Sequence, residues 1–205
     1  MGREMEVRLI DGTHDPVGTI SIAAGTCYGK PDISRKRVSN CFSSGHMGVF
    51  EHACATFDIR NISRSCSHQL VRHRLASFCQ QSQRYCKLDV RSNDWYVTPP
   101  DILADDYKRV WYDSLMAQYA DNYRLALDQL DCKPEDARYL LPEATKTDIV
   151  MTMNCREIYH ILDLRTSKRS QWEIRQLANL ILEVLDEHDD WYFLMDLWRS
   201  YPPKA

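Results

Sequence analysis

Apolar and polar residues alternate most clearly over residues 52–59, where every second side chain is apolar. A period of two is typical of a strand with one buried face. Ser63 then precedes a helical pattern that we extend to about Arg74. At 100° per residue, Gln69 and His73 lie on the apolar face of this expected helix. The pattern therefore predicts a strand followed closely by a helix that carries two polar side chains inward.

The rest of the chain combines weaker extended segments with helical ones. Extended structure is expected over residues 5–25, as a weak strand with turns, and over 78–97 and 148–154. Helices are expected over 32–44, 102–130, 155–164 and 191–198, and from Pro134 onward. Ser170 to Glu173 has the form of a capping box that opens one more amphipathic helix. Because no internal repeat or linker is visible, the pattern predicts one α+β domain over residues 1–205.

Composition adds a prediction of location. Of the 205 residues, 44% are hydrophobic and 27% charged, with a net charge of −3, as in a globular protein. No apolar run is as long as a membrane span, the amino terminus lacks an apolar stretch, and Glu6 stands where a myristoylation motif needs Ser or Thr. We expect a cytoplasmic protein without membrane association. Its eight cysteines are then expected to be thiols, and mostly packing residues.

Charge distribution indicates an anionic ligand. All seven glycines precede residue 49, so the rest of the chain has no glycine-rich phosphate loop. Residues 60–88 contain six Lys or Arg and no Asp or Glu. Such a segment in an acidic chain is unfavourable unless an anion or an acidic neighbour compensates it. Gln69 and His73, beside these arginines, either satisfy backbone carbonyls or bind that ligand.

Arg72-His73-Arg74, followed after seven residues by Ser82 and then by Arg84, matches the signature of the flavin-dependent thymidylate synthases. Further blocks in the family's order are Gly45-His46, Phe50-Glu51-His52, Gln69, Ala137-Arg138, Leu141-Pro142, Asn154-Cys-Arg156, Leu164-Arg165 and Gln171-Trp172-Glu173-Ile174. The chain resembles this family over about residues 20–185.

The resemblance implies a fold and a reaction. The fold would have an antiparallel sheet core with long helices. The reaction would methylate dUMP to dTMP, with methylenetetrahydrofolate as one-carbon donor, NADPH-reduced FAD as hydride source and no cysteine nucleophile. The expected assembly is a homotetramer whose active sites draw on several subunits.

Residue roles also come from the resemblance. Arg165 would face the uracil ring as the main catalytic group. The alternative interpretation is that this arginine, at the end of a helix, only stabilises the helix dipole. The residues expected at dUMP are Gln69, Arg72, Gln80, Ser82, Arg84, Arg138 and Arg165. The residues expected at FAD are Cys54, Arg72, His73, Arg74, Gln80, Asn154, Arg156 and His160. His52 would lie beside the flavin and folate unless it is a core histidine, and no metal site is implied.

The chain departs from the family pattern at several positions. Relatives commonly have Ser or Thr at Cys54, Asn at Cys79 and His160, Glu at Gln80, and in some cases His at Arg169. One alternative is therefore a flavoprotein of this fold that has lost synthase activity. Another is a nucleic-acid-binding module that uses residues 60–88 as a phosphate track, which the pI of 6.2 opposes.

Overall fold

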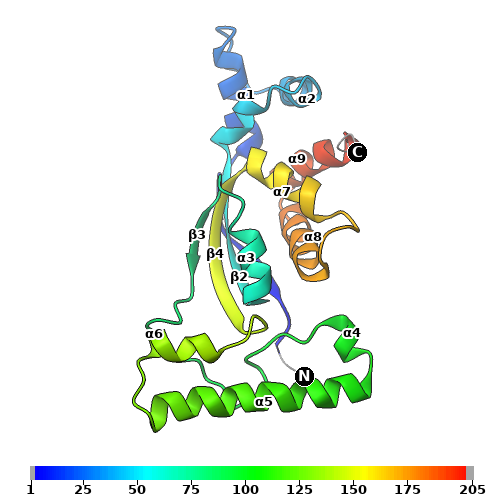
Figure 1. Ribbon diagram of the computed structural model, residues 1–205. Coiled ribbons are helices and arrows are strands. Elements are labelled where there is room, and N and C mark those ends of the chain that lie inside the picture. The colour runs from blue at the N-terminus through cyan, green and yellow to red at the C-terminus, as the bar shows by residue number, and fades with distance from the viewer. Residues whose placement is uncertain (1–2, 202–205) are drawn as a thin grey trace. The chain divides into compact units, whose positions relative to one another are not determined.

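The computed structural model describes residues 3–201. Its strands form a four-stranded antiparallel sheet in the order β1-β2-β4-β3. The strands are β1 (Glu6–Gly12), β2 (Cys54–Ser63), β3 (Ser77–Gln80) and β4 (Lys146–Asn154). The helices are α1 (Pro16–Thr26), α2 (Arg35–Ser43), η1 (Met47–His52), α3 (Arg64–Leu70), α4 (Pro100–Leu103), α5 (Asp106–Asp128), α6 (Pro134–Ala137), η2 (Arg138–Leu140), α7 (Cys155–Arg165), α8 (Trp172–Asp186) and α9 (Asp189–Ser200) (Figure 1). The α+β prediction is confirmed.

Side-chain alternation explains the two central strands. Ala55, Phe57 and Ile59 in β2 are buried, as the period of two predicted. In β4, Ile149 and Met151 are likewise buried in alternation with half-buried neighbours. The sheet therefore forms where the sequence places apolar groups on every second position.

The chain divides into two compact units. The first unit consists of residues 3–5, Arg60–His68 and Gln80–Ile149. In it the long helix α5 has α4 at its N-terminal end and packs against α6 (Figure 1). Its core is aromatic: the Tyr96 ring lies edge-on to Trp95 and Tyr112, and the Tyr96 hydroxyl donates to Asp113 Oδ1 over 2.7 Å.

The second unit consists of Glu6–Ile59, Gln69–Cys79 and residues 150–201. Helices α7, α8 and α9 form one packed group in it, coloured yellow to red in Figure 1. Phe42, Phe50 and Tyr159 meet edge to face where α2, η1 and α7 pack together. The prediction of a single domain over residues 1–205 stays a prediction.

The helix expected from Ser63 to about Arg74 is shorter than predicted. Ser63 does cap it, because its hydroxyl accepts from Cys66 N over 2.9 Å. The helix α3 ends at Leu70, however, and His73 N closes a turn onto Leu70 O over 3.1 Å. His73 therefore does not share a helix face with Gln69, although it is buried as expected.

The helix expected over residues 102–130 is also divided. Asp105 has extended backbone angles, and its carboxylate accepts from Tyr107 N and Lys108 N, so it caps α5. The residues before it form the separate helix α4. The short side chain of an aspartate begins a new helix here where the apolar period alone suggested continuity.

Three smaller expectations were wrong. Residues 5–25 hold helix α1 after their strand, capped by Asp15, which accepts from Gly18 N. Only Ser77–Gln80 forms a strand in the stretch expected to be extended up to residue 97. Gln171, not Ser170, caps α8, because its side-chain oxygen accepts from Glu173 N and Ile174 N.

The cysteines are not mainly packing residues. Cys66 and Cys155 are buried, Cys41 and Cys132 are half-buried, and Cys27, Cys54, Cys79 and Cys86 are exposed. All eight are free thiols. Separately, none of the helices within residues 3–201 is both long and apolar enough to cross a membrane.

Candidate active site

The predicted site residues fall into two groups, one in each unit. The second unit holds His52, Cys54, Gln69, Arg72, His73, Arg74, Asn154, Arg156, His160 and Arg165. The first unit holds Gln80, Ser82, Arg84 and Arg138. Each group has its own hydrogen-bond network.

In the second unit, α7 positions the central side chains. Asn154 caps this helix, with its side-chain oxygen accepting from Glu157 N over 2.9 Å. Glu157, His160 and Arg165 then follow along α7 at spacings that place them on adjoining parts of its surface. Asn154, predicted to be a flavin contact, therefore also has a structural role as the start of the helix.

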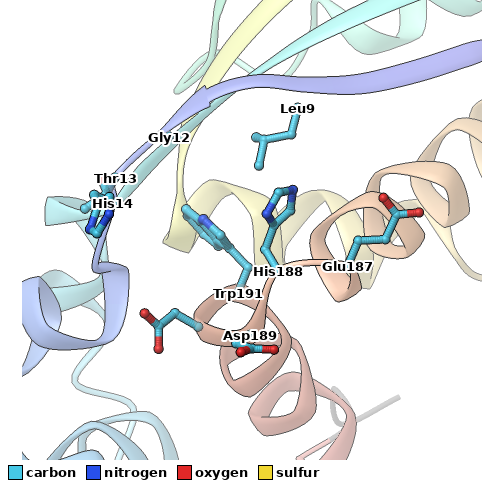
Figure 2. A pocket seen from close by; sticks show the side chains of 9 residues that line it. Leu9, Gly12, Thr13, His14, Glu187, His188, Asp189 and Trp191 are labelled. Atoms are coloured by element: carbon cyan, nitrogen blue, oxygen red, sulfur yellow. The ribbon is translucent and has the colours of Figure 1, made fainter.

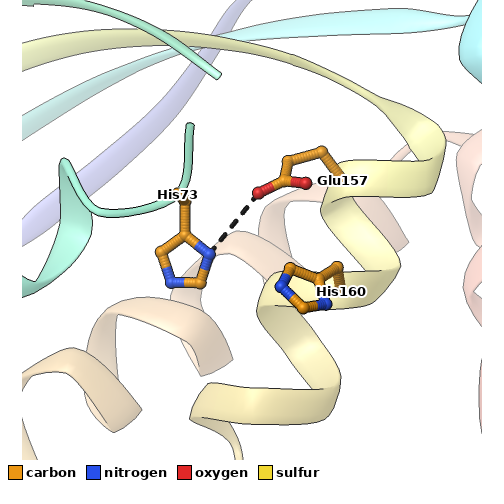
Figure 3. Close-up of side chains that lie close together, drawn as sticks. All are labelled: His73, Glu157 and His160. Atoms are coloured by element: carbon orange, nitrogen blue, oxygen red, sulfur yellow. Dashed lines mark ion pairs between the residues drawn. The ribbon is translucent and has the colours of Figure 1, made fainter. Parts of the chain in front are cut away.

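His73 meets this surface from the turn after α3. Arg165 Nε donates to His73 Nε2 over 3.1 Å, and His73 Nδ1 lies 3.4 Å from Glu157 Oε1. Figure 3 shows the His73 ring beside Glu157 and His160. The side chains of His73 and Glu157 are each only 3% exposed. His73, a loop residue of the sequence signature, is thus in direct contact with Arg165, the last residue of α7.

Burial sets the charge of this group. Loss of solvation, aided by the charges of Arg165 and His160, lowers the pKa of His73 to about 4. Burial likewise raises the pKa of Glu157 above its ordinary value, against the opposing effect of His160 and Arg156. A close His–Glu pair with both charges present would shift each pKa the other way. His73 is therefore a neutral imidazole at neutral pH.

The same side chains also carry potential metal-ligand atoms. One ligand atom each from His73, Glu157 and His160 lies within 4.8 Å of the others. Two histidines and a carboxylate are donors that transition metals accept. The Arg165 guanidinium on His73, however, places a fixed positive charge beside any such ion. The arrangement fits an anionic ligand better than a metal.

Two arginines that flank His73 in sequence are available to a ligand. Arg72 and Arg74 are both exposed. Neither guanidinium has a hydrogen bond or ion pair with another residue in the described part of the chain, whereas Arg156 is paired with Glu51 over 2.5 Å.

His52 and Cys54 are exposed, so the interpretation of His52 as a core histidine is wrong.

The group in the first unit is organised by Glu135. Its carboxylate accepts from Arg84 Nε over 2.6 Å, and its backbone oxygen accepts from Arg138 Nε over 3.0 Å. Ser82 lies next to Arg84, whose backbone N donates to the serine hydroxyl. The structure thus brings together Ser82, Arg84 and Arg138, three of the four residues of this group. The carboxylate of Glu135 pairs with one of them, Arg84.

Gln80, the fourth residue, is held separately. Its amide nitrogen donates to Ser67 Oγ over 2.9 Å and to Thr147 Oγ1 over 3.3 Å. Glutamate at this position could not donate to these hydroxyls when ionised. The amide of Gln80 therefore satisfies a local hydrogen-bond network that an ionised carboxylate could not form in the same way.

A hollow of about 300 Å³ adjoins Arg138. Its lining includes Arg64, His68, Gln83, Arg138, Tyr139 and Glu143. Two buried donors in it, Arg64 Nε and Gln83 Nε2, have no partner among residues 3–201. Burial, followed by the charge of Arg138, lowers the pKa of Arg64. Unpartnered buried donors beside two cations suit an anion.

Sequence reasoning did not assign Arg64 and Gln83 to the site. Both lie in the segment without acidic residues, which was the signal that could have identified them. The sequence could not predict that these side chains are buried. For Arg64, burial accompanies contacts with distant residues: its backbone N donates to Thr145 O, and its guanidinium donates to Gln81 O.

A second hollow, of about 500 Å³, lies elsewhere in the second unit. Figure 2 shows it between the end of β1 and the start of α9. It is lined by Leu9, Gly12, Thr13, His14, Glu187, His188, Asp189, Asp190 and Trp191. None of these is a predicted site residue, and three of them are acidic, so this hollow is not suited to an anionic substrate.

Burial makes two of the cysteine thiols harder to ionise and so poorer nucleophiles. Burial raises the pKa of the Cys155 thiol to about 12, which keeps it protonated at neutral pH. Partial burial also raises the pKa of Cys41. The described residues offer arginines, a neutral histidine and hydroxyl groups for chemistry at the site.

An α+β fold with two arginine-rich groups and no phosphate loop is typical of a protein that binds anionic ligands through side chains. The family model described as "Thymidylate synthase complementing protein" matches residues 8–189. The flavin-dependent thymidylate synthase of Geobacter sulfurreducens is 40% identical over 193 residues, covering 88% of this chain and 82% of that protein. That of Pyrococcus furiosus is 38% identical over 199 residues, covering 91% and 81%. This chain belongs to the thymidylate synthase complementing protein family.

Solved structures agree on the fold. A Helicobacter pylori flavin-dependent thymidylate synthase complexed with FAD and dUMP superimposes with a TM-score of 0.77 at 24% identity, covering 94% of this chain and 99% of that one. A UMP/dUMP methylase from Streptomyces cacaoi gives a TM-score of 0.83 at 21% identity, covering 98% and 97%. The fold expected from the sequence signature is therefore the fold that the chain has.

Proposed function

We propose that this protein is a flavin-dependent thymidylate synthase that methylates dUMP to dTMP. The observation that carries the proposal is family membership over residues 8–189, with relatives that bear this name. The proposed co-substrates are methylenetetrahydrofolate and NADPH, and the proposed cofactor is FAD.

The residues around His73 fit a flavin dinucleotide. Arg72 and Arg74 present guanidinium groups that have no hydrogen bond or ion pair with another residue among residues 3–201. The pyrophosphate of FAD needs such cations where no glycine-rich loop exists. The reduced flavin, when bound, supplies the hydride. We assign Arg72, His73, Arg74, Asn154, Arg156 and His160 to its binding, with Cys54 and Gln80 at its edge and His52 toward the folate.

Arg165 is the group that we assign to the uracil ring. Its Nε is used by His73, so the Nη nitrogens remain to donate to a pyrimidine carbonyl. Donors aimed at that oxygen stabilise negative charge as it develops on the ring, which makes C5 more nucleophilic without a bond to the protein. A neutral His73 favours this role, because it does not repel the guanidinium.

Arg84, Arg138 and Ser82 are assigned to the phosphate of dUMP. A phosphate dianion is a stronger acceptor than the single carboxylate of Glu135 that now pairs with Arg84. The unpartnered donors of Arg64 and Gln83 extend the same set of groups. Gln69, Gln80 and Arg72 complete the proposed nucleotide contacts.

The proposed assembly is a homotetramer in the cytoplasm, in which different subunits contribute to each active site. Five Trp and eleven Tyr are compatible with extensive interfaces. Sedimentation velocity of the purified protein tests this: a folded monomer that turns over would reject the shared-site arrangement.

The experiment for the function measures three quantities on one preparation. We expect the folded protein to bind FAD, to oxidise NADPH, and to form dTMP from dUMP and methylenetetrahydrofolate. Folded protein that fails to take up FAD at saturating concentration would reject the proposal. FAD binding with NADPH oxidation but no dTMP would instead support a flavoprotein that has lost synthase activity.

A further inference from the structure

His73 uses both ring nitrogens, and only one arrangement of protons satisfies its neighbours. Arginine has only donors, so His73 Nε2 must be the acceptor for Arg165 Nε at 3.1 Å. Because burial keeps the imidazole neutral, its single proton is then on Nδ1. That atom faces Glu157 Oε1 at 3.4 Å. The tautomer that holds Arg165 is thus the one that points a proton at Glu157.

Glu157 is buried and held beside His73. Its side chain is 3% exposed, and its backbone N is fixed by the Asn154 cap at the start of α7. Within residues 3–201 its carboxyl group has no hydrogen bond or ion pair other than the contact with His73. A buried carboxyl with a single partner is costly, which indicates that the contact has a purpose beyond packing.

We infer that Glu157 is a positioning residue, which holds His73 in its Nδ1–H tautomer so that the Nε2 lone pair can orient Arg165. The inference rests on the proposed function in one respect, namely that Arg165 faces the uracil ring. Glu157 touches neither substrate nor flavin in this account. It acts through His73, as a carboxylate orients a histidine that binds a metal.

Removing the acceptor reverses the arrangement. Without an oxygen at Nδ1, only the contact with Arg165 favours a proton on that atom, and the imidazole can place its proton on Nε2 instead. Two N–H donors, His73 Nε2–H and Arg165 Nε–H, would then face each other at 3.1 Å. Arg165 must turn away, and its remaining donors lose their aim at the ring.

Two substitutions separate the hydrogen-bond acceptor from the charge. Glu157→Gln keeps a carbonyl oxygen that can accept from Nδ1–H, whereas Glu157→Leu keeps the approximate volume and removes the acceptor. Glu183→Gln, at an exposed position of α8, is the matched control for loss of an acidic group. We expect the glutamine variant and the control to stay within a few-fold of the original rate of dTMP formation.

For Glu157→Leu we expect dTMP formation at saturating dUMP to fall by about 10- to 100-fold, the range found when a group that orients a functional histidine is lost. NADPH-dependent flavin reduction should change far less, because that half-reaction needs no charge stabilisation on uracil. An equal fall in both half-reactions would indicate general damage to the fold and would overturn the inference.

The tautomer itself is measured by ¹⁵N chemical shifts in protein labelled at histidine, with the His73 signals identified by their loss in His73→Asn. We expect protonated Nδ1 in the original protein and in Glu157→Gln, and protonated Nε2 in Glu157→Leu. Protonated Nε2 in the original protein overturns the inference even if the leucine variant does not fold.

The experiments distinguish failure of the proposed function from failure of the positioning role of Glu157. If the original protein forms no dTMP but the tautomer changes with Glu157→Leu, the proposed function fails and the Glu157–His73–Arg165 arrangement stands. If dTMP is formed and Glu157→Leu alters neither rate nor tautomer, the positioning role fails and the proposed function stands.

Discussion

The neutrality of His73 is what lets an arginine and a histidine share a buried contact. A protonated imidazole 3.1 Å from the Arg165 guanidinium would repel it and would offer no lone pair. Burial prevents this by lowering the pKa of His73 to about 4. The charge on Arg165 is therefore available to a ligand rather than opposed by its neighbour.

Arg165→Ala tests that availability. The variant should fold and bind FAD, yet lose about 10²-fold or more in dTMP formation, the scale of removing one charge-stabilising donor. Flavin reduction by NADPH should suffer much less. Arg109→Ala, an exposed arginine paired within α5, provides the control. Separate assays of the two half-reactions decide the matter, and near-original dTMP formation in Arg165→Ala would reject its catalytic role.

Ser82→Ala should affect binding rather than chemistry. A neutral hydrogen bond to phosphate contributes about 0.5 to 1.5 kcal/mol, which corresponds to roughly a 2- to 13-fold rise in the KM for dUMP. The serine hydroxyl accepts only from Arg84 N in the described structure, so its removal should leave the fold intact. Steady-state titration with dUMP measures the effect. Loss of kcat at saturating dUMP would contradict the assignment.

At the level of elements, the sequence was most informative where side chains repeat with a period. The strand expected over residues 52–59 is β2 over Cys54–Ser63, and the helices expected over 32–44 and 155–164 are α2 over Arg35–Ser43 and α7 over Cys155–Arg165. Local caps decided the rest: Asp105 divides one helix, and Gln171 replaces Ser170 as the start of another. The periodicity of apolar residues indicates which face of an element is buried. It does not indicate which polar side chain caps a helix by accepting hydrogen bonds from backbone N–H groups.

The site was predictable to a similar extent. The family resemblance named His73 and Arg165, from two separate blocks of the sequence, and the structure joins them. Glu157 was not named, because a glutamate in an amphipathic helix shows no sign of its burial without the turn that brings His73 onto it. Glu135, which connects Arg84 and Arg138, was missed for the same reason. Contacts between segments distant in sequence are what the pattern leaves out.

Asn154→Ala should weaken α7 as an element. The asparagine oxygen accepts from Glu157 N, and loss of such a cap costs about 1 kcal/mol. Asn154→Asp keeps the acceptor and should retain most of the stability. Urea denaturation of the protein without flavin isolates this effect from any role in cofactor binding. Equal stability of Asn154→Ala and the original protein would show that the cap contributes nothing.

For the whole molecule, the absence of glycine after residue 48 and the high arginine content have one consequence. The arginines that we propose as phosphate ligands are partly fixed by protein contacts, as Arg84 is by Glu135. In the proposed function these arginines would therefore serve both a ligand and the protein's own hydrogen-bond networks. Cysteine has no part in this scheme.

Single replacement of each of the eight cysteines should leave measurable dTMP formation. The flavin route needs no thiolate, and the Cys155 thiol has its pKa raised to about 12 by burial. Cys66 and Cys155 are best changed to Ala, since a buried hydroxyl would need a new partner, and the exposed ones to Ser. Complete loss of activity in a folded variant that still binds flavin would indicate a covalent enzyme mechanism.

The buried neutral histidine also makes the stability of the molecule depend on pH. Between pH 6.5 and about 4 an unfolded chain takes up a proton at His73 that the native protein does not, so the free energy of unfolding falls as the pH falls through this range. The contribution reaches at most about 3 kcal/mol near pH 4. Glu157, whose pKa is raised, acts in the opposite direction, because the native protein keeps its proton to higher pH.

Comparison with His73→Asn isolates the histidine from these other groups. Glu157, His160 and Arg165 surround the ring and are retained in the variant. The difference in unfolding free energy between the two proteins should therefore shrink as the pH is lowered from 7 to 4, as measured by urea denaturation at each pH. His14→Asn, at an exposed histidine, should show no such trend. A difference between the original protein and His73→Asn that stays constant over this range would mean that His73 takes up its proton over the same pH range in the native protein as in the unfolded chain, and that burial does not keep the ring neutral.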